Sequence, residues 1–253
     1  MKVFASDFDN TLHFMDRTGG YFRSGDLSAI LDFQDHGGLF GLCTGRPLFG
    51  FGNDLDHGPE LDFIVASSGA VVAEKKEDTF IPVFESVLTT KQIAMLDETF
   101  GKESIFYIHA DGHIFTLYER RPEYPQQTVL PSIDALNGRH ITCVSVWTPS
   151  NRTASLIAAR INAMYGKEMA GYQNNQWIDV VHAGVSKGTG ALHAKQLLHG
   201  DVIAGIGDSF NDIPLLEAAD ISFSFHASEN EVKEKADYLV DTVAEALAIF
   251  AKI

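Results

Sequence analysis

The sequence predicts an α/β protein with a doubly wound parallel-sheet core and an inserted α+β domain. Strand and helix patterns alternate near the N-terminus and again near the C-terminus, which is typical of βαβ units and hence of a parallel sheet. Between these segments the pattern changes to helices combined with hairpin strands. We therefore expect a core formed by residues 1–82 and 183–253, with an inserted domain at residues 83–182.

The N-terminal core segment begins with a short apolar strand over Val3–Phe8. A helix follows in residues 24–38, where Leu27, Ile30 and Leu31 form one face and the paired glycines favour a C-cap. The apolar runs "LFGLCT" and "FIVASS" are typical of buried strands, and Arg46-Pro47 indicates the start of a short helix between them.

The inserted segment opens with Thr89 and Gln92, which form a capping box before a helix with Ile93, Leu96 and Phe100 on one face. Two strands then meet at Asp111-Gly112, a type I′ hairpin signal. A further strand, "HITCVSVW", precedes a helix over residues 150–166. We expect His109 and His113 to be surface neighbours across the hairpin, and Trp147 and Trp177 to pack in the core of this domain.

The C-terminal segment returns to alternating elements. Ser186 can cap a helix that continues through Leu198, "VIAGIG" and "ISFSF" are strands, and Pro214 indicates a helix start between them. Thr242 and Glu245 form a capping box before the last helix. These elements complete the predicted parallel core.

Composition restricts the function. With 19 Lys and Arg against 34 Asp and Glu, the formal net charge is −15, which argues against general binding to nucleic acid or anionic membranes. The N-terminus has no signal-peptide pattern, and no apolar run reaches the ~18 residues of a membrane span. Cys43 and Cys143 lie in separate apolar runs, which indicates buried thiols. We expect a cytoplasmic protein, and the sequence leaves its oligomeric state open.

Four polar segments stand where core strands are expected to end. They are "DFDNT" at residues 7–11, "CTGR" at 43–46, "SKG" at 186–188 and "GDSFND" at 207–212. In an open parallel sheet, ligands bind in the crevice at the carboxyl ends of the strands. Segments that are distant in the sequence can therefore form one site.

The residue types in these segments indicate phosphate chemistry. Asp7, Asp9, Asp208 and Asp212 would form a carboxylate-rich pocket that needs a cation, and oxygen ligands suit Mg²⁺. The metal would also let one carboxylate attack phosphorus, because it stabilises charge on the transferring group. Thr44 offers a hydroxyl, Gly45 allows close backbone approach, and Lys187 offers an ammonium group for the phosphate oxygens.

The four segments, in this order, resemble those of the haloacid dehalogenase (HAD) superfamily of aspartate-nucleophile phosphohydrolases: DxDxT, a Thr at a strand end, a Lys and GDxxND. The inserted segment resembles the large α+β cap (type C2) of the Cof-like branch, which contains many sugar-phosphate phosphatases. The resemblance spans essentially the whole chain. Ser68 departs from it, because this branch often has Asn at that position.

The resemblance implies a role for each motif residue. Asp7 would attack the phosphoryl group, and Asp9 would protonate the leaving oxygen and then activate water. Mg²⁺ would be held by Asp7, Asp208 and the backbone carbonyl of Asp9. The remaining roles are phosphate binding by Thr44, Gly45 and Lys187, and positioning of metal waters and Lys187 by Asn211 and Asp212.

We therefore expect a Mg²⁺-dependent phosphatase that acts on a small phosphorylated metabolite, such as a sugar phosphate. Arg46, Arg120 and Asn174 are candidate substrate contacts, although a solvated edge or a polar turn also explains the last two. Three alternatives stay open: a phosphotransferase or mutase, a cofactor or nucleotide phosphatase, and a catalytically silent ligand-binding protein.

Overall fold

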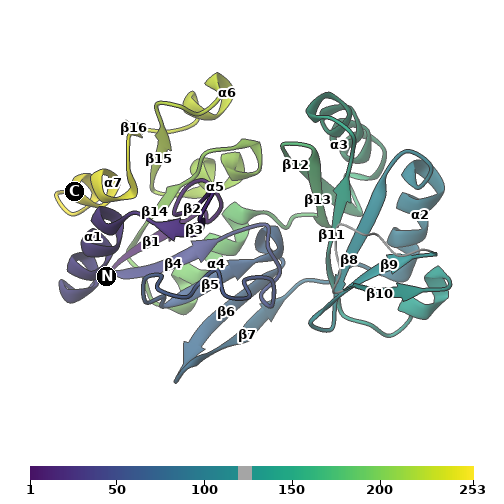
Figure 1. The fold of residues 1–253 in the computed structure, drawn as a ribbon, viewed down its shortest axis with the longest axis horizontal. Helices are drawn as coiled ribbons and strands as arrows, with labels where there is room; N and C mark the ends of the chain where they lie inside the picture. Colours follow the sequence, from purple (N-terminus) through teal and green to yellow (C-terminus); the bar gives the residue numbers. More distant parts are fainter. Residues whose placement is uncertain (119–126) are drawn as a thin grey trace. The chain divides into compact units, whose positions relative to one another are not determined.

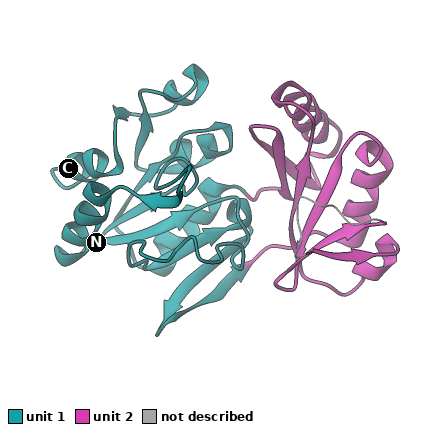
Figure 2. Ribbon diagram, in the orientation of Figure 1, with its two compact units in different colours: residues 1–84, 186–253 teal, residues 85–185 magenta. Residues whose placement is uncertain are grey.

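The structure is a computed structural model that describes residues 1–118 and 127–253. The chain forms two compact units, one of residues 1–84 and 186–253 and one of residues 85–185 (Figure 2). These bounds lie within a few residues of the expected division at 82 and 183. No helix in the described part of the chain is long and apolar enough to cross a membrane.

The first unit is built on an eight-stranded sheet with the order β16-β15-β14-β1-β4-β5-β6-β7 (Figure 1). The strands from β16 to β5 run parallel, whereas β6 is antiparallel to β5. Their bounds are β1 Lys2–Ser6, β4 Leu39–Cys43, β5 Phe63–Ala66, β6 Val71–Lys76, β7 Thr79–Glu85, β14 Val202–Ile206, β15 Ile221–Phe225 and β16 Tyr238–Val240. The predicted parallel core is confirmed.

Helices cover both faces of this sheet, as the doubly wound prediction requires. On one face Phe4 packs beside Phe40, with ring centroids 5.7 Å apart, and beside Phe250 of α7. On the other face Val3 and Ala5 pack with apolar residues of α4 and α5. The helices are α1 Ser24–Asp35, α4 Lys187–Leu197, α5 Ile213–Ala218, α6 Asn230–Lys233 and α7 Val243–Phe250. The alternating side chains of β1 thus divide between two apolar layers.

Two details of the first unit differ from the prediction. The expected helix after Arg46-Pro47 does not form, and the chain between β4 and β5 is a series of turns. Leu31 of α1 is 59% exposed, whereas Phe33 is buried against the sheet. The hairpin of β2 (His13–Asp16) and β3 (Gly19–Phe22), which follows the first motif, was not predicted from the sequence. These short segments lack a clear hydrophobic period.

The second unit is a six-stranded sheet with the order β10-β9-β8-β11-β13-β12, and α2 and α3 pack on one face. All described pairs are antiparallel except β9 with β10. The elements are α2 Thr90–Phe100, β8 Ile105–Ala110, β9 His113–Leu117, β10 Gln127–Leu130, β11 Ile141–Trp147, α3 Asn151–Tyr165, β12 Met169–Asn174 and β13 Trp177–His182. The predicted α+β class of the insertion is confirmed.

The hairpin prediction is right about the turn and wrong about its histidines. Asp111 and Gly112 have φ values of 51° and 75°, as a type I′ turn requires. His109 lies opposite Ile114, not opposite His113, and is only 4% exposed, so burial lowers its pKa to about 4. The two tryptophans lie opposite each other in β11 and β13 and are only partly buried, outside the apolar cluster that α2 and α3 cover.

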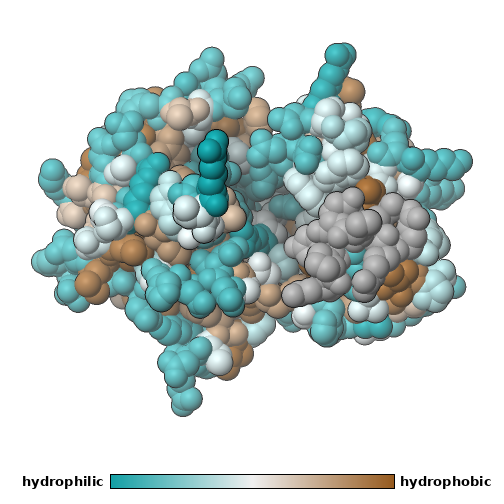
Figure 3. Space-filling view, in the orientation of Figure 1, coloured by the Kyte–Doolittle hydropathy of each residue, from teal (hydrophilic) through white to brown (hydrophobic). Residues whose placement is uncertain are grey.

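Hydrophilic side chains predominate on the face of the molecule drawn in Figure 3, and the hydrophobic areas there are small and scattered. Scattered exposed apolar side chains of this kind are normal on the surface of a folded protein. The buried apolar side chains gather in three clusters, two on the faces of the first sheet and one in the second unit.

The capping box of α2 gives a stability prediction. Thr89 Oγ1 accepts a hydrogen bond from the Gln92 amide at 3.3 Å, and the Thr89 amide donates to Gln92 Oε1 at 2.7 Å. We expect Thr89→Ala to lower the free energy of unfolding by about 1 kcal/mol, measured by urea titration. Thr89→Ser keeps the acceptor and is the control, so equal losses in both variants would contradict this role.

Candidate active site

Three of the four motifs follow strands that are neighbours in the first sheet. Asp7 comes directly after β1, and its amide donates to Ile206 at the end of β14 at 2.9 Å. Thr44 comes directly after β4, and Asp208 follows β14 by one residue. Because these strands are parallel, their carboxyl ends lie at one edge of the sheet. The sheet therefore brings together residues that are about 200 positions apart in the sequence.

Lys187 lies at the centre of this edge. Its Nζ donates to Asp7 Oδ1 at 2.6 Å and to Asp212 Oδ1 at 2.5 Å. The side chains of Lys187, Asp7 and Asp212 are 1%, 8% and 0% exposed. Burial by itself would lower the pKa of Lys187, but the carboxylates of Asp212 and Asp7 outweigh it and hold this pKa well above its usual range. The lysine is therefore a buried cation that binds two carboxylates.

Lys187 is placed by the start of α4. Ser186 is the N-cap, and its hydroxyl accepts a hydrogen bond from the Thr189 amide at 3.1 Å. The Ser186 amide in turn donates a hydrogen bond to the Thr189 hydroxyl at 2.9 Å. This cap fixes the first turn of the helix, which the sequence analysis predicted to begin here.

Both carboxylate oxygens of Asp212 accept hydrogen bonds from within the protein. While Oδ1 accepts from Lys187, Oδ2 accepts the backbone amides of Asp208 at 3.1 Å and Ser209 at 3.0 Å. Asn211 is 3% exposed, and its Oδ1 accepts from the Ser209 hydroxyl at 2.7 Å. Asp212 therefore holds both the lysine and the loop after β14, whereas Asn211 contacts that loop.

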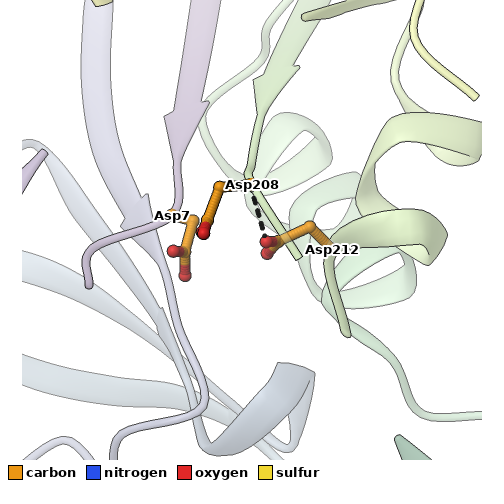
Figure 4. Close-up of side chains that lie close together, drawn as sticks. All are labelled: Asp7, Asp208 and Asp212. Atoms are coloured by element: carbon orange, nitrogen blue, oxygen red, sulfur yellow. Dashed lines mark hydrogen bonds between the residues drawn. The ribbon is translucent and has the colours of Figure 1, made fainter. Parts of the chain in front are cut away.

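The carboxylates of Asp7, Asp208 and Asp212 form an acidic cluster in which one oxygen of each lies within 4.8 Å of the others (Figure 4). Burial and the neighbouring charge of Asp212 raise the pKa of Asp7 well above its usual range and that of Asp208 to about 6. Thr11 donates to Asp208 Oδ1 at 3.2 Å. A cation bound by Asp7 and Asp208 would offset this repulsion, and their oxygen donors fit Mg²⁺.

Asp9 lies outside the acidic cluster and pairs with Arg46. Arg46 Nε donates to Asp9 Oδ2 at 2.8 Å, and Nη2 donates to Oδ1 at 2.6 Å. Arg46 Nη1 donates to Asp54 Oδ2 at 2.6 Å, and the guanidinium carbon lies 4.8 Å from the centre of the Phe8 ring. Arg46, expected as a substrate contact, thus binds two carboxylates of the protein.

The turn after β5 supports the second motif, although the sequence did not predict it. Ser67, Ser68 and Gly69 all have positive φ, at 50°, 52° and 99°, although serine rarely adopts this conformation. The Ser68 amide donates to Thr44 O at 3.0 Å, and the Ser67 amide donates to Arg46 O at 2.8 Å. The turn therefore supports the loop that carries the second motif. The available signal was Ser68, which stands where the Cof-like branch often has Asn, a residue that tolerates positive φ.

The other candidate substrate residues fall elsewhere. Asn174 ends β12 in the second unit, before a turn in which Asn175 has a φ of 53°. Gln173 Nε2 donates to Asn175 O at 3.0 Å, so this segment is a hydrogen-bonded polar turn. Arg120 lies outside the described residues.

Gly69 gives a prediction about the site. A Cβ at Gly69 would lie 1.9 Å from Ser186 O, the acceptor of the first hydrogen bond of α4. We expect Gly69→Ala to lower the free energy of unfolding by about 1–2 kcal/mol for its positive φ and by a further ~1–3 kcal/mol for this overlap. Urea titration measures both losses together.

Gly37→Ala is the matched control, because Gly37 has a φ of 83° and no atom lies within 4 Å of the position that its Cβ would take. It should show only the backbone loss of about 1–2 kcal/mol. If the two variants lose the same free energy of unfolding, the close approach of Gly69 to α4 does not contribute to stability.

The chain matches one protein family over almost its whole length. The sequence pattern of this family, described as haloacid dehalogenase-like hydrolase, matches residues 4–252. A curated protein of Streptococcus pyogenes serotype M6, whose name joins a phosphatase to a peptidyl-prolyl cis-trans isomerase, is 24% identical over 99% of this chain. The match covers 53% of that protein, so the chain spans about half the length of this relative.

Solved structures share the fold over nearly the whole chain. A phosphatase of the haloalkanoate (HAD) superfamily from Bacteroides thetaiotaomicron has a TM-score of 0.80 at 20% identity, covering 100% of this chain and 96% of its own. A haloacid dehalogenase-like hydrolase from B. subtilis has a TM-score of 0.81 at 16% identity, and the match covers 98% of this chain and 97% of that protein. A HAD subclass IIB sugar phosphatase has a TM-score of 0.79 at 17% identity, covering 100% of both chains.

Proposed function

The chain belongs to the haloacid dehalogenase-like hydrolase family, and from this premise we propose that it is a Mg²⁺-dependent phosphatase of a small phosphomonoester. The membership confirms the family and the hydrolase class predicted from the four motifs. The observation that carries the proposal is the buried ion-paired group of Lys187, Asp7 and Asp212 beside Asp208. It combines a nucleophile, a cation for phosphate oxygens and a place for a metal.

We assign the first step to Asp7. Its carboxylate oxygen attacks phosphorus, the bond from phosphorus to the ester oxygen breaks, and an aspartyl-phosphate forms on Asp7. Asp9, in its protonated form, gives its proton to the leaving oxygen, so that an alcohol departs. Bound Mg²⁺ would neutralise charge on the transferring phosphoryl group.

The second step returns the enzyme to its starting state. Water attacks the phosphorus of the aspartyl-phosphate and gives a proton to the Asp9 carboxylate, and the bond from phosphorus to Asp7 breaks. Inorganic phosphate leaves, and Asp9 again carries the proton for the next turnover. Lys187, already 2.6 Å from Asp7, would hold a phosphoryl oxygen in both steps together with the Thr44 hydroxyl and the Gly45 backbone.

We propose a sugar phosphate as the substrate and assign the choice of leaving group to the second unit. The likeness to a sugar phosphatase over the whole chain supports this choice. Asn174 and Arg120 are the residues of this unit that we propose for substrate contact. We propose the cytoplasm as the compartment, since Cys43 and Cys143 are buried thiols.

The first experiment is phosphate release from sugar phosphates, nucleotides and an aryl phosphate, with Mg²⁺ or with EDTA. We expect turnover only with Mg²⁺, and we expect Asp7→Asn to lower it by at least about 10³-fold, because the amide is a poor nucleophile. Asp32→Asn, at an exposed position of α1, is the control and should keep full activity.

Two results would count against the proposal. One is a wild-type protein that releases no phosphate from any of these compounds with Mg²⁺. The other is turnover that survives in Asp7→Asn, which would exclude an aspartyl-phosphate on this residue.

A further inference from the structure

Arg46 is a cation between two carboxylates at the rim of the site. It makes two parallel bonds to Asp9, from Nε at 2.8 Å and from Nη2 at 2.6 Å, and its Nη1 bonds Asp54 at 2.6 Å. Such a bidentate pair fixes the orientation of both groups, which a single bond does not. The Asp9 side chain is 43% exposed, so the orientation of its carboxylate depends on this partner.

The guanidinium is itself held independently of Asp9. Besides Asp54, its Nη1 contacts the Gly50 carbonyl at 3.4 Å, and the Phe8 ring lies 4.8 Å from the guanidinium carbon. Asp54 and Gly50 belong to the series of turns that replaces the expected helix after Pro47. These turns thus carry the contacts that position Arg46.

We propose, on the basis of the proposed function, that Arg46 is a positioning residue that orients the Asp9 carboxylate for proton transfer, rather than a residue that binds substrate. Asp54 fixes Arg46 for this purpose. An ionised carboxylate has about four acceptor positions, of which Arg46 uses two, so Asp9 can still accept a proton from water. When Asp9 carries its proton, one bond to Arg46 is given up while the bond to Asp54 keeps the guanidinium in place.

The role of Arg46 can be separated from phosphate binding by the choice of leaving group. An alkoxide leaves from an alkyl phosphate only if Asp9 protonates it, whereas 4-nitrophenolate leaves without a proton. Both substrates carry the same phosphoryl group. Loss of a phosphate-binding cation would therefore slow both, and loss of Asp9 positioning would slow only the alkyl phosphate.

The test measures release of the leaving group in the first turnover, with Mg²⁺, for 4-nitrophenyl phosphate and for an alkyl phosphate that the wild type hydrolyses. Arg46→Met keeps an apolar stem over Phe8 and removes the guanidinium. We expect it to slow the alkyl phosphate by at least about 10-fold and the aryl phosphate by less than about 3-fold, within the range of acid–base effects. Asp54→Asn should show the same preference to a smaller degree.

Two further variants calibrate this result. Asp9→Asn should slow the alkyl phosphate selectively, and adding Arg46→Met to it should cause no further loss, because the two residues act as one unit. Arg23→Met is the matched control: its guanidinium lies 4.2 Å from the centre of the Phe14 ring and donates to Asp241 O, so neither substrate should slow. Thermal unfolding verifies that each variant folds. If Arg46→Met does not fold, Asp54→Asn tests the inference in its place.

Equal slowing of both substrates in Arg46→Met and Asp54→Asn would overturn the inference and make Arg46 a phosphate-binding residue. An unchanged or faster reaction with the alkyl phosphate would overturn it as well. A wild type that hydrolyses neither substrate would instead count against the proposed function. The wild-type measurement therefore tests the proposed function before any variant is compared.

Discussion

The buried contact of Lys187 with Asp7 and Asp212 is the interaction on which the site depends. All three side chains are less than a tenth exposed, and charges that leave water without a partner are very costly. Removing one member of a buried pair typically costs about 3–5 kcal/mol, because the other charge is left uncompensated. The two carboxylates hold Lys187 in its charged form inside the protein. Lys187 in turn favours the ionised form of Asp7, against burial and the charge of Asp212, which together raise the pKa of this carboxyl. The pairing also joins β1, the start of α4 and the loop after β14 at one point.

The fold places a cation where local structure alone disfavours it. Lys187 occupies the first position of α4, where the helix dipole repels positive charge. Two carboxylates within 2.6 Å overcome this effect. Glycines allow the close packing around them: Gly69 lies against the carbonyl that starts α4, and a Cβ at Gly207 would lie 2.3 Å from Asp212 Cγ. The charged contacts and the close backbone packing therefore depend on each other.

Two ion-paired groups of three residues lie at the candidate site, each with one cation between two carboxylates. Lys187 joins Asp7 and Asp212 in the interior, and Arg46 joins Asp9 and Asp54 at the rim. Each group carries a formal charge of −1 when ionised, and Asp208 adds another. The excess of negative charge gives a physical reason for a divalent cation at this site, because a phosphate dianion would otherwise be repelled.

The sequence by itself determined the elements with strong local signals: the capped starts of α2 and α4, the Asp111-Gly112 turn, the alternation that makes a parallel core, and the motif residues at its strand ends. These features depend on neighbours within a few positions of the chain. Only the tertiary structure decided that Leu31 is exposed and that His109 is buried. It also decided that turns replace a helix after Pro47 and that residues 67–69 adopt positive φ. The pairing of Arg46 with Asp9 is a third outcome of this kind. Each of these depends on contacts between segments that are distant in the sequence, and hydrophobic period and capping signals carry no information about such contacts.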